Sequence, residues 1–330
     1  MNINAVFHKH GPTVGYWGDW GRTNIQYRIY ERLCIENPDI TFNSINWKPF
    51  CDYKEFSSGN VVGIDSPQNM TLVNPENNKT IIFNIGPRVE GSFSHSTGFK
   101  GLDIVQIIGG ASMSKRWYDG QPLSRKEYIN DIRIPIVFPM DKISEEIIAR
   151  DYNIDRETKK INKAIFIGNL EHRGLPGRDK ISKILNKHPL FEITQSIRGI
   201  KFKDYLDKMN EYKISLSLNG LAEMCYRDWE SMAISIPILR SEIYNTYSPD
   251  IVADYHYISG SDQCIDGSTG YAANYNDIAD QFISKIEDVI DDDELLKRVG
   301  KNGRNYFEQS ILSEKIIDQV IKKINLNLLY

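Results

Sequence analysis

The residues best suited to chemistry in this chain are an arginine and a glutamate three positions apart, Arg227 and Glu230. Residues with this spacing lie on one face of an α-helix. The pattern predicts such a helix from near Cys225, between a β-rich segment at 214–218 and a strand led by Pro237. Its N-terminus then lies beside the carboxyl end of the preceding strand, where open α/β sheets bind ligands. A guanidinium there suits a phosphate, and a carboxylate suits a pair of ribose hydroxyls.

An ordinary amphipathic helix with one surface ion pair would show the same spacing. From this segment alone, both interpretations stand.

The same stretch resembles the nucleotide-sugar signature of GT-B glycosyltransferases, in which an acidic-rich loop leads into a Glu-Ala-Met-Ala-x-Gly-x-Pro run. Here the run is Glu230-Ser-Met-Ala-Ile-Ser235-Ile-Pro237, with Ser235 where the family usually has glycine. Arg227 makes it similar to the exostosin-like branch and to family-1-type domains with an Arg-x-x-Glu-Ala core. Retaining members carry two glutamates eight apart, whereas Glu223 and Glu230 are seven apart here. The resemblance implies that both glutamates and Arg227 bind the donor.

The resemblance is good over residues 160–310 and weak over 1–150. It implies an α/β fold of two Rossmann-like doubly wound domains that face each other across a cleft, with a C-terminal helix that crosses back. The expected domains are 1–155, which would bind the acceptor, and 156–330, which would bind the nucleotide sugar and end in the terminal helix.

Further candidate donor-binding residues follow other strands of the second half. Gly168 and Arg173 fall where GT-B enzymes carry a Gly-x-Leu…Lys-Gly loop whose basic residue meets the donor diphosphate. Arg178, near a helix N-terminus, would add to that anion site. A basic surface turn is the alternative. Arg198 follows a strand where such folds hold the base, and Asn219 would approach the sugar or phosphate, although ordinary turns explain both equally well.

The acceptor side would need a general base in the first half, because an inverting enzyme removes the proton of the acceptor hydroxyl as that hydroxyl attacks the anomeric carbon. A histidine or a positioned carboxylate can do this. The candidates at strand ends are His10, Asp19, Glu90 and His95. Resemblance to inverting families favours His10 and Asp19 as the catalytic residues. A solvated histidine and a capping aspartate are the alternatives.

No metal site is predicted from the sequence. His8 and His10 would share one face of a strand, but no third ligand is near them. The acidic run at 291–294 has the pattern of a surface cluster with a helix N-cap. GT-B enzymes typically need no divalent metal, so the resemblance implies metal-independent transfer with no cofactor beyond the nucleotide-diphosphate sugar.

The composition is that of an ordinary globular protein, with 41% hydrophobic and 25% charged residues in 330. A net charge of −4 gives no electrostatic reason to expect nucleic acid as a partner. We find no apolar run long enough to span a bilayer, no signal-peptide pattern and no CxxC spacing among the four cysteines. These features predict a cytoplasmic protein with free thiols and leave its oligomeric state open.

Apolar runs bounded by turn residues predict the elements that would position these side chains. In the first half we expect an irregular polar stretch from 48 to 79, and strands at 3–7, 40–47, 80–85, 102–108 and 134–138, with helices after Asn24 and at 144–150. In the second half we expect strands at 164–168, 191–194, 214–218 and 255–259. Helices are expected after 177, at 202–210, from 225, at 276–290 and from 294, and in the apolar tail at 312–328.

The sequence therefore predicts a hexosyl- or pentosyltransferase that moves a sugar from a nucleotide-diphosphate sugar to an acceptor hydroxyl, in glycan or polysaccharide synthesis. Two alternatives are a sugar-nucleotide-modifying enzyme of the epimerase kind with the same fold, and a non-catalytic nucleotide- or sugar-binding protein. Turnover on addition of an acceptor would separate the transferase from both.

Overall fold

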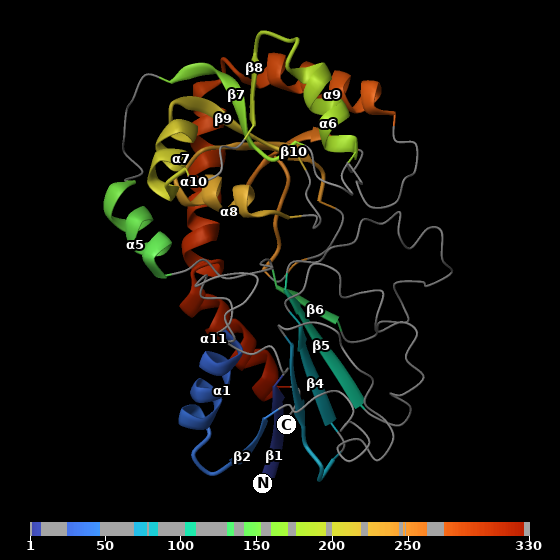
Figure 1. Cartoon of the computed structure of the whole chain (residues 1–330), viewed down its shortest axis with the longest axis vertical. Coiled ribbons are helices and arrows are strands. Elements are labelled where there is room, and N and C mark those ends of the chain that lie inside the picture. Colours follow the sequence, from blue (N-terminus) through green and yellow to red (C-terminus); the bar gives the residue numbers. More distant parts are fainter. Residues whose placement is uncertain are drawn as a thin grey trace. The chain divides into compact units, whose positions relative to one another are not determined.

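The chain divides into two compact units, shown in a computed structural model (Figure 1). The structure describes residues 2–7, 25–46, 69–77, 79–84, 103–109, 131–134, 142–152, 160–170, 176–195, 200–218, 224–243, 247, 249–262 and 274–326. Of the described elements, unit 1 holds β1–β6, α1 and α11, and unit 2 holds α5–α10 and β7–β11. Compared with the boundary expected near residue 155, α5 (Lys142–Asp151) groups with unit 2 and α11 (Ser313–Ile324) groups with unit 1.

Unit 1 is built on a six-stranded mixed sheet in the order β2-β1-β3-β4-β5-β6. Its strands are β1 (Asn2–Phe7), β2 (Thr41–Asn46), β3 (Asn69–Val73), β4 (Lys79–Asn84), β5 (Asp103–Gly109) and β6 (Asp131–Ile134). β3 runs antiparallel to both of its neighbours, and the other adjacent pairs are parallel. Four of the five strands expected in this half are found near their expected positions. The fifth was expected at 134–138, whereas β6 ends at Ile134, and residues 135–138 lie outside the described residues.

The strand β3 corrects the prediction of an irregular stretch from 48 to 79. Its sequence alternates polar residues with Met70 and Leu72, which is a strand pattern. The turn into β4 is fixed by two asparagine side chains: Asn74 accepts a hydrogen bond from the Glu76 N–H at 3.1 Å, and Asn77 accepts one from the Lys79 N–H at 2.9 Å. The prediction missed this strand because it is short and its neighbours in the sequence are polar, including the asparagines of the turn.

The last helix packs on the first, as the predicted returning C-terminal helix requires. α1 (Ile25–Glu36) lies against α11 in unit 1. Arg32 on α1 donates to Asp318 on α11 at 3.0 Å. α11 also buries an apolar stripe at helical spacing, comprising Ile316, Ile317, Val320, Ile321 and Ile324.

Unit 2 is a doubly wound parallel sheet, which confirms the α/β fold class for this half. The strand order is β11-β10-β9-β7-β8, and all neighbouring pairs are parallel. The strands are β7 (Ile161–Gly168), β8 (Phe191–Gln195), β9 (Tyr212–Ser217), β10 (Ile238–Ser241) and β11 (Ile258–Ser261). α6 (Pro176–Leu185) and α9 (Tyr275–Val289) pack together on one face, and α7 (Phe202–Asn210), α8 (Tyr226–Ala233) and α10 (Asp293–Ser310) cover the other (Figure 1).

The helix α8 is held closely at its C-terminal end. The N–H groups of Ser235 and Ile236 donate to the carbonyls of Met232 and Ser231, which forms a Schellman motif. Ser235 has φ 60°, in the region that favours glycine, so the glycine usual in the family signature has a conformational reason here. A Cβ on Gly300 of α10 would lie 2.3 Å from the Ser235 carbonyl oxygen. α10 can therefore approach this turn only because residue 300 is glycine.

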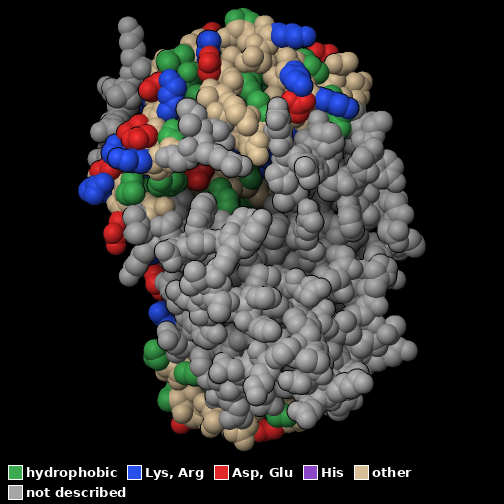
Figure 2. Space-filling model, in the orientation of Figure 1, with side chains coloured by type: hydrophobic (Ala, Val, Ile, Leu, Met, Phe, Trp, Pro, Cys, Tyr) green, Lys and Arg blue, Asp and Glu red, His purple; other side chains and the backbone are tan. Residues whose placement is uncertain are grey.

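The described surface of unit 2 mixes both signs of charge. Figure 2 shows Lys and Arg side chains interspersed with Asp and Glu on the visible face of this unit. On that face neither sign dominates among the described side chains. Within the part of the chain that the structure describes, no helix is long and apolar enough to cross a membrane.

Candidate functional site

The order of strands in unit 2 identifies where a ligand would bind. The chain places β8 on one side of β7 and β9 on the other, so the direction of strand addition reverses between β7 and β9. Open α/β sheets bind ligands outside the carboxyl ends of the strands at such a switch point. At these ends lie Gly168 of β7 and Leu218, the residue after β9. Two buried arginines from different helices meet the sheet here.

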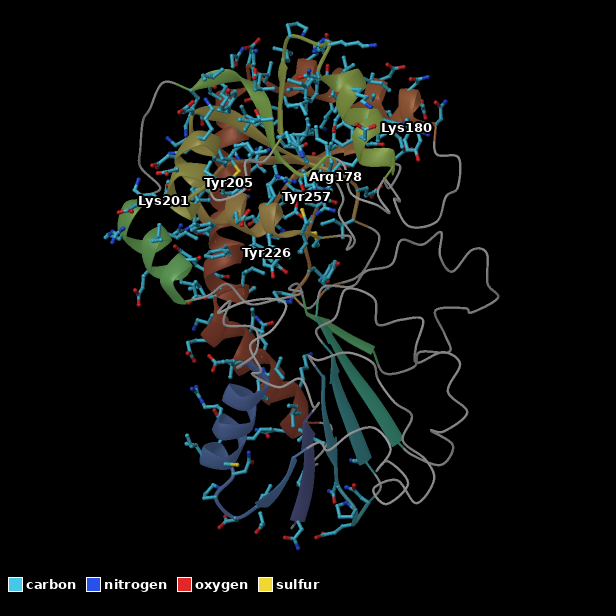
Figure 3. The ribbon with its side chains drawn as sticks, in the orientation of Figure 1. Arg178, Lys180, Lys201, Tyr205, Tyr226 and Tyr257 are labelled. Atoms are coloured by element: carbon cyan, nitrogen blue, oxygen red, sulfur yellow. The ribbon has the colours of Figure 1, made fainter. Side chains whose placement is uncertain are left out.

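Arg178 links the ends of the two central strands. It extends from the first turn of α6, and its guanidinium donates to the carbonyl oxygens of Asn169 at 3.1 Å and of Leu218 at 2.9 Å. The residue is 8% exposed (labelled in Figure 3). Arg178 was predicted to belong to an anion site, and the structure places it at the switch point rather than on a surface turn.

Arg227 lies beside it, at the first turn of α8. Its Nε donates to the Ile167 carbonyl oxygen at 3.1 Å, its Nη2 donates to the same oxygen, and the guanidinium carbon is 4.1 Å from the centre of the Phe166 ring. Arg227 is 8% exposed, and its Nη1 is buried without a hydrogen-bond partner in the described structure. An unmade hydrogen bond at a buried donor costs about 1–3 kcal/mol. An anionic oxygen bound at this position would satisfy it.

The two guanidiniums are close enough to repel each other. Burial and, after it, the charge of Arg227 lower the pKa of Arg178 to about 10. Arg227 forms no ion pair with a carboxylate among the described residues, which include Glu230 three positions later. The alternative of a helix with a surface ion pair is therefore wrong for this segment. A bound anion would relieve both the burial cost and the repulsion.

Gly168 provides the space that Arg227 occupies. A Cβ at this position would lie 2.2 Å from Arg227 Nη2 and 2.9 Å from Phe166 Cζ. The last residue of β7 must therefore be glycine for the guanidinium to reach the Ile167 carbonyl. The sequence predicted Gly168 as a donor-binding residue, and the structure gives a physical reason for a glycine beside the site.

Glu230 lies one turn further along the same face of α8 and is partly buried. Its Oε2 accepts a hydrogen bond from the Tyr205 hydroxyl of α7 at 2.8 Å. Burial raises the pKa of Glu230, while the Tyr205 hydrogen bond and the charge of Arg227 oppose that shift. The structure thus brings Gly168, Arg178 and Arg227 to the carboxyl ends of β7 and β9, with Glu230 one turn further along α8. Their role in donor binding stays a prediction.

A second buried charge on α8 was not predicted. Asp228 forms an ion pair with Arg240 of β10 at 3.1 Å, both side chains being at most 1% exposed, and Asp228 Oδ2 accepts a hydrogen bond from the Cys225 N–H at 2.6 Å. Arg240 also donates to the Ser241 carbonyl at 3.1 Å. The pair fixes the N-terminal turn of α8 against the sheet. A charged residue inside the apolar strand Ile238–Ser241 was the available signal, because a buried arginine requires a partner.

Eight of the candidate site residues lie outside the described residues. They are the general-base candidates His10, Asp19, Glu90 and His95 and the donor-binding candidates Arg173, Arg198, Asn219 and Glu223. Their roles stay predictions.

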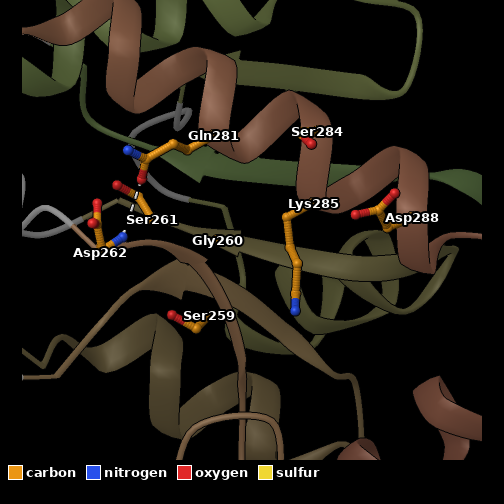
Figure 4. Close-up of a pocket in the computed structure, with 8 residues that line it drawn as sticks. All are labelled: Ser259, Gly260, Ser261, Asp262, Gln281, Ser284, Lys285 and Asp288. Carbon is orange, nitrogen blue, oxygen red and sulfur yellow. Dashed lines mark hydrogen bonds between the residues drawn. The ribbon is translucent and has the colours of Figure 1, made fainter.

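A separate polar cavity of about 280 Å³ lies at the edge strand of unit 2 (Figure 4). It is lined by residues 259–262 and by Gln281, Ser284, Lys285 and Asp288 of α9. Lys285 is 3.4 Å from Asp254, so the charge of this lysine is already paired. The cavity is away from the switch point, which makes it the weaker candidate for the main site. Within the described ranges, no group of three or more His, Cys, Asp or Glu residues is arranged to hold a metal ion.

No protein-family model matches the sequence, and no curated protein matches it with significance. Solved structures do resemble the chain. The pneumococcal O-GlcNAc transferase GtfA, in complex with UDP and GlcNAc, is 11% identical with a TM-score of 0.39, and the match covers 68% of this chain and 53% of GtfA. WaaG, a glycosyltransferase involved in lipopolysaccharide biosynthesis, is 12% identical with a TM-score of 0.44, and the match covers 96% of this chain and 99% of WaaG. Anabaena HepE, in complex with UDP-glucose, is 8% identical with a TM-score of 0.41, and the match covers 91% of this chain and 89% of HepE.

The resemblance seen in the sequence and the structural comparison name the same class, glycosyltransferases. The chain spans about half the length of GtfA.

Proposed function

We propose that the chain is a glycosyltransferase that binds a nucleotide-diphosphate sugar at the carboxyl ends of β7 and β9 and transfers the sugar to an acceptor hydroxyl. The observation that carries the proposal is the buried, unpartnered Nη1 of Arg227 beside the second buried guanidinium of Arg178. Two adjacent cations at a switch point match the charge of a diphosphate, and guanidinium–phosphate hydrogen bonds are among the strong ones.

The same arrangement supports a chemical role in the transfer step. When the bond between the anomeric carbon and the leaving oxygen breaks, negative charge develops on the departing diphosphate. Donors that are already oriented toward that charge stabilise the transition state more than the ground state. Arg227 is held in place by the Ile167 carbonyl and the Phe166 ring before any ligand arrives, so little reorganisation is needed.

Glu230 would accept hydrogen bonds from the ribose of the donor. The general base of an inverting reaction would come from His10 or Asp19, and Arg173, Arg198, Asn219 and Glu223 would complete the donor site. These assignments follow from the family resemblance. We expect no metal requirement on the same ground.

The first experiment is a binding screen against UDP, GDP, ADP, CMP and their sugars, with thermal stability as the readout. Wild type should show a selective rise in melting temperature with one nucleotide. Arg227→Met should lower the affinity for that diphosphate by about 10–100-fold, the value of one or two charge-assisted hydrogen bonds. Its affinity for the corresponding nucleoside should stay near that of wild type.

Turnover then separates the functions. A transferase releases the nucleoside diphosphate faster when an acceptor is added, an epimerase-like enzyme converts the sugar nucleotide without one, and a binding protein does neither. If wild type binds no nucleotide, or if Arg227→Met weakens nucleoside and diphosphate equally, the diphosphate assignment is wrong.

A further inference from the structure

The hydroxyl of Tyr205 links two helices at the candidate site. Tyr205 lies on α7 (labelled in Figure 3), Glu230 lies on α8, and both helices pack against β9. The phenol oxygen is 2.8 Å from Glu230 Oε2. Since a carboxylate only accepts hydrogen bonds when it is ionised, the tyrosine is the donor in this pair.

The two oxygens of Glu230 are used differently. Oε2 accepts the Tyr205 hydrogen bond, whereas Oε1 accepts none from the described residues. Burial raises the pKa of Tyr205 well above its ordinary value, and the charge of Glu230 raises it further, so the phenol keeps its proton at neutral pH. One carboxylate oxygen is therefore fixed by the protein, and the other is left for a ligand.

Arg227 is the competing partner for this carboxylate. It precedes Glu230 by three positions on the same helix, where opposite charges usually pair, and its Nη1 has no partner in the described structure. The two side chains nevertheless form no ion pair among the contacts of the described residues. Among the described residues, Glu230 is therefore bonded to Tyr205 rather than to Arg227, and Nη1 of Arg227 has no partner.

We propose that Tyr205 is the positioning residue for Glu230 and sets how strongly the site discriminates ribonucleotides from 2′-deoxyribonucleotides. The inference deepens the proposed function and rests on its assignment of Glu230 to ribose. A fixed carboxylate discriminates better than a mobile one between the two kinds of nucleotide. Its hydrogen bond to the 2′-hydroxyl does not carry the entropy cost of immobilising the glutamate side chain.

The test compares the affinities of each ribonucleoside diphosphate and its 2′-deoxy counterpart, using UDP, GDP, ADP and CDP as probes. In Tyr205→Phe, which keeps the ring and removes the donor, the preference for the ribonucleotide should fall about 3–10-fold, part of the worth of one hydrogen bond to a charged group. Glu230→Gln should nearly abolish the preference. The double variant should match Glu230→Gln, since Tyr205 acts only through the carboxylate.

The matched control is Tyr152→Phe. The Tyr152 hydroxyl donates to Asp207 Oδ1 at 2.7 Å, which is also a tyrosine–carboxylate bond to α7. This variant should lose stability and keep the ribose preference of wild type. A lower preference in Tyr152→Phe would assign the Tyr205 effect to general loosening of α7 and overturn the inference.

Two further outcomes are decisive. If Glu230→Gln loses the preference and Tyr205→Phe keeps it, the inference is wrong and the proposed function stands. If wild type shows no ribose preference, the assignment of Glu230 to ribose is wrong, and the inference is overturned with it.

Discussion

Two arginines on neighbouring elements of unit 2 are almost equally buried, yet their surroundings differ. Arg240 of β10 is 1% exposed and is paired with Asp228 at 3.1 Å. Arg227 of α8 is 8% exposed. Among the described residues it donates hydrogen bonds to the Ile167 carbonyl and contacts the Phe166 ring, and its Nη1 is unpaired. A paired buried charge fixes the fold, whereas an unpaired one costs stability unless a ligand completes it. Burial alone would not have separated the structural arginine from the binding arginine.

The largest effect should come from breaking the structural pair. Arg240→Met leaves Asp228 buried and unpaired, and we expect a loss of about 3–5 kcal/mol in the free energy of unfolding, measured by urea denaturation. Arg227→Met should change the same quantity by less than about 1 kcal/mol, because the loss of the hydrogen bonds to the Ile167 carbonyl is offset by removal of the buried, unsatisfied Nη1. Equal losses of unfolding free energy in the two variants would contradict the assignment of a structural role to Arg240 and a binding role to Arg227. The double variant Asp228→Asn/Arg240→Met should recover part of the loss.

A second prediction displaces the binding arginine without removing it. Gly168→Ala introduces a Cβ where Arg227 Nη2 lies, and should lower the affinity for a nucleoside diphosphate about tenfold, or about 1.4 kcal/mol. The loss in the free energy of unfolding should be smaller than this loss of binding free energy, because the displaced atom is the end of a long side chain.

Gly260→Ala is the control for that variant. Its Cβ would lie 2.6 Å from Phe282 Cδ1 in the core, so it should reduce stability and leave the affinity unchanged. A diphosphate affinity of wild-type strength in Gly168→Ala would show that the position of Arg227 is irrelevant to binding.

A third prediction concerns the pH dependence of stability. Burial raises the pKa of Glu230 in the folded protein. The contribution of this group to the free energy of unfolding is therefore fully present below its ordinary pKa of 4.5, and it is lost as the pH rises through the raised pKa. Glu230→Gln should therefore be more stable than wild type near neutral pH, and the difference should vanish toward pH 4. Urea denaturation between pH 4 and 8 measures it. A difference that does not change with pH would contradict this reasoning.

The smallest effect should come from the other end of α8. Ser235 has φ 60°, so Ser235→Gly should raise the free energy of unfolding by up to about 1 kcal/mol, the strain relieved less the entropy cost of glycine. Ser235→Ala keeps the Cβ and should give no gain. Thermal unfolding of the two variants side by side distinguishes the conformational effect from loss of the hydroxyl. Nucleotide affinity should be unchanged in both.

The elements of unit 2 could be predicted from sequence more fully than the contacts among them. The helix at 202–210 was predicted with the observed bounds, Phe202–Asn210, because its apolar residues recur at helical spacing. The strand at 69–73 was missed, because an alternation of polar and apolar residues over only five positions is a weak strand signal. Gly168, Arg178, Arg227 and Glu230 were predicted as site residues because they lie at the end of a strand or after one in the same sheet. That they bind a ligand stays a prediction.

Pattern could not decide how those side chains are paired. Tyr205 is simply one residue of the α7 helix pattern, and its bond to Glu230 joins residues 25 positions apart. Asp228 and Arg240 likewise meet only once β10 lies beside β9. Such contacts depend on the rotamers and packing of several elements at once, which a local sequence pattern does not contain.

The packing of α11 on α1 also bears on how the protein is made. Unit 1 takes its first helix from near the start of the sequence and its last from residues 313–324, with the whole of unit 2 between them. At ~5–20 residues per second of ribosomal synthesis, the partner of α1 emerges only after tens of seconds. The main segment of unit 2, Ile143–Ile311, is complete before α11 is made, so it can fold while α1 still lacks this partner. During synthesis, the face of α1 that α11 will contact is thus the surface that a chaperone would have to cover.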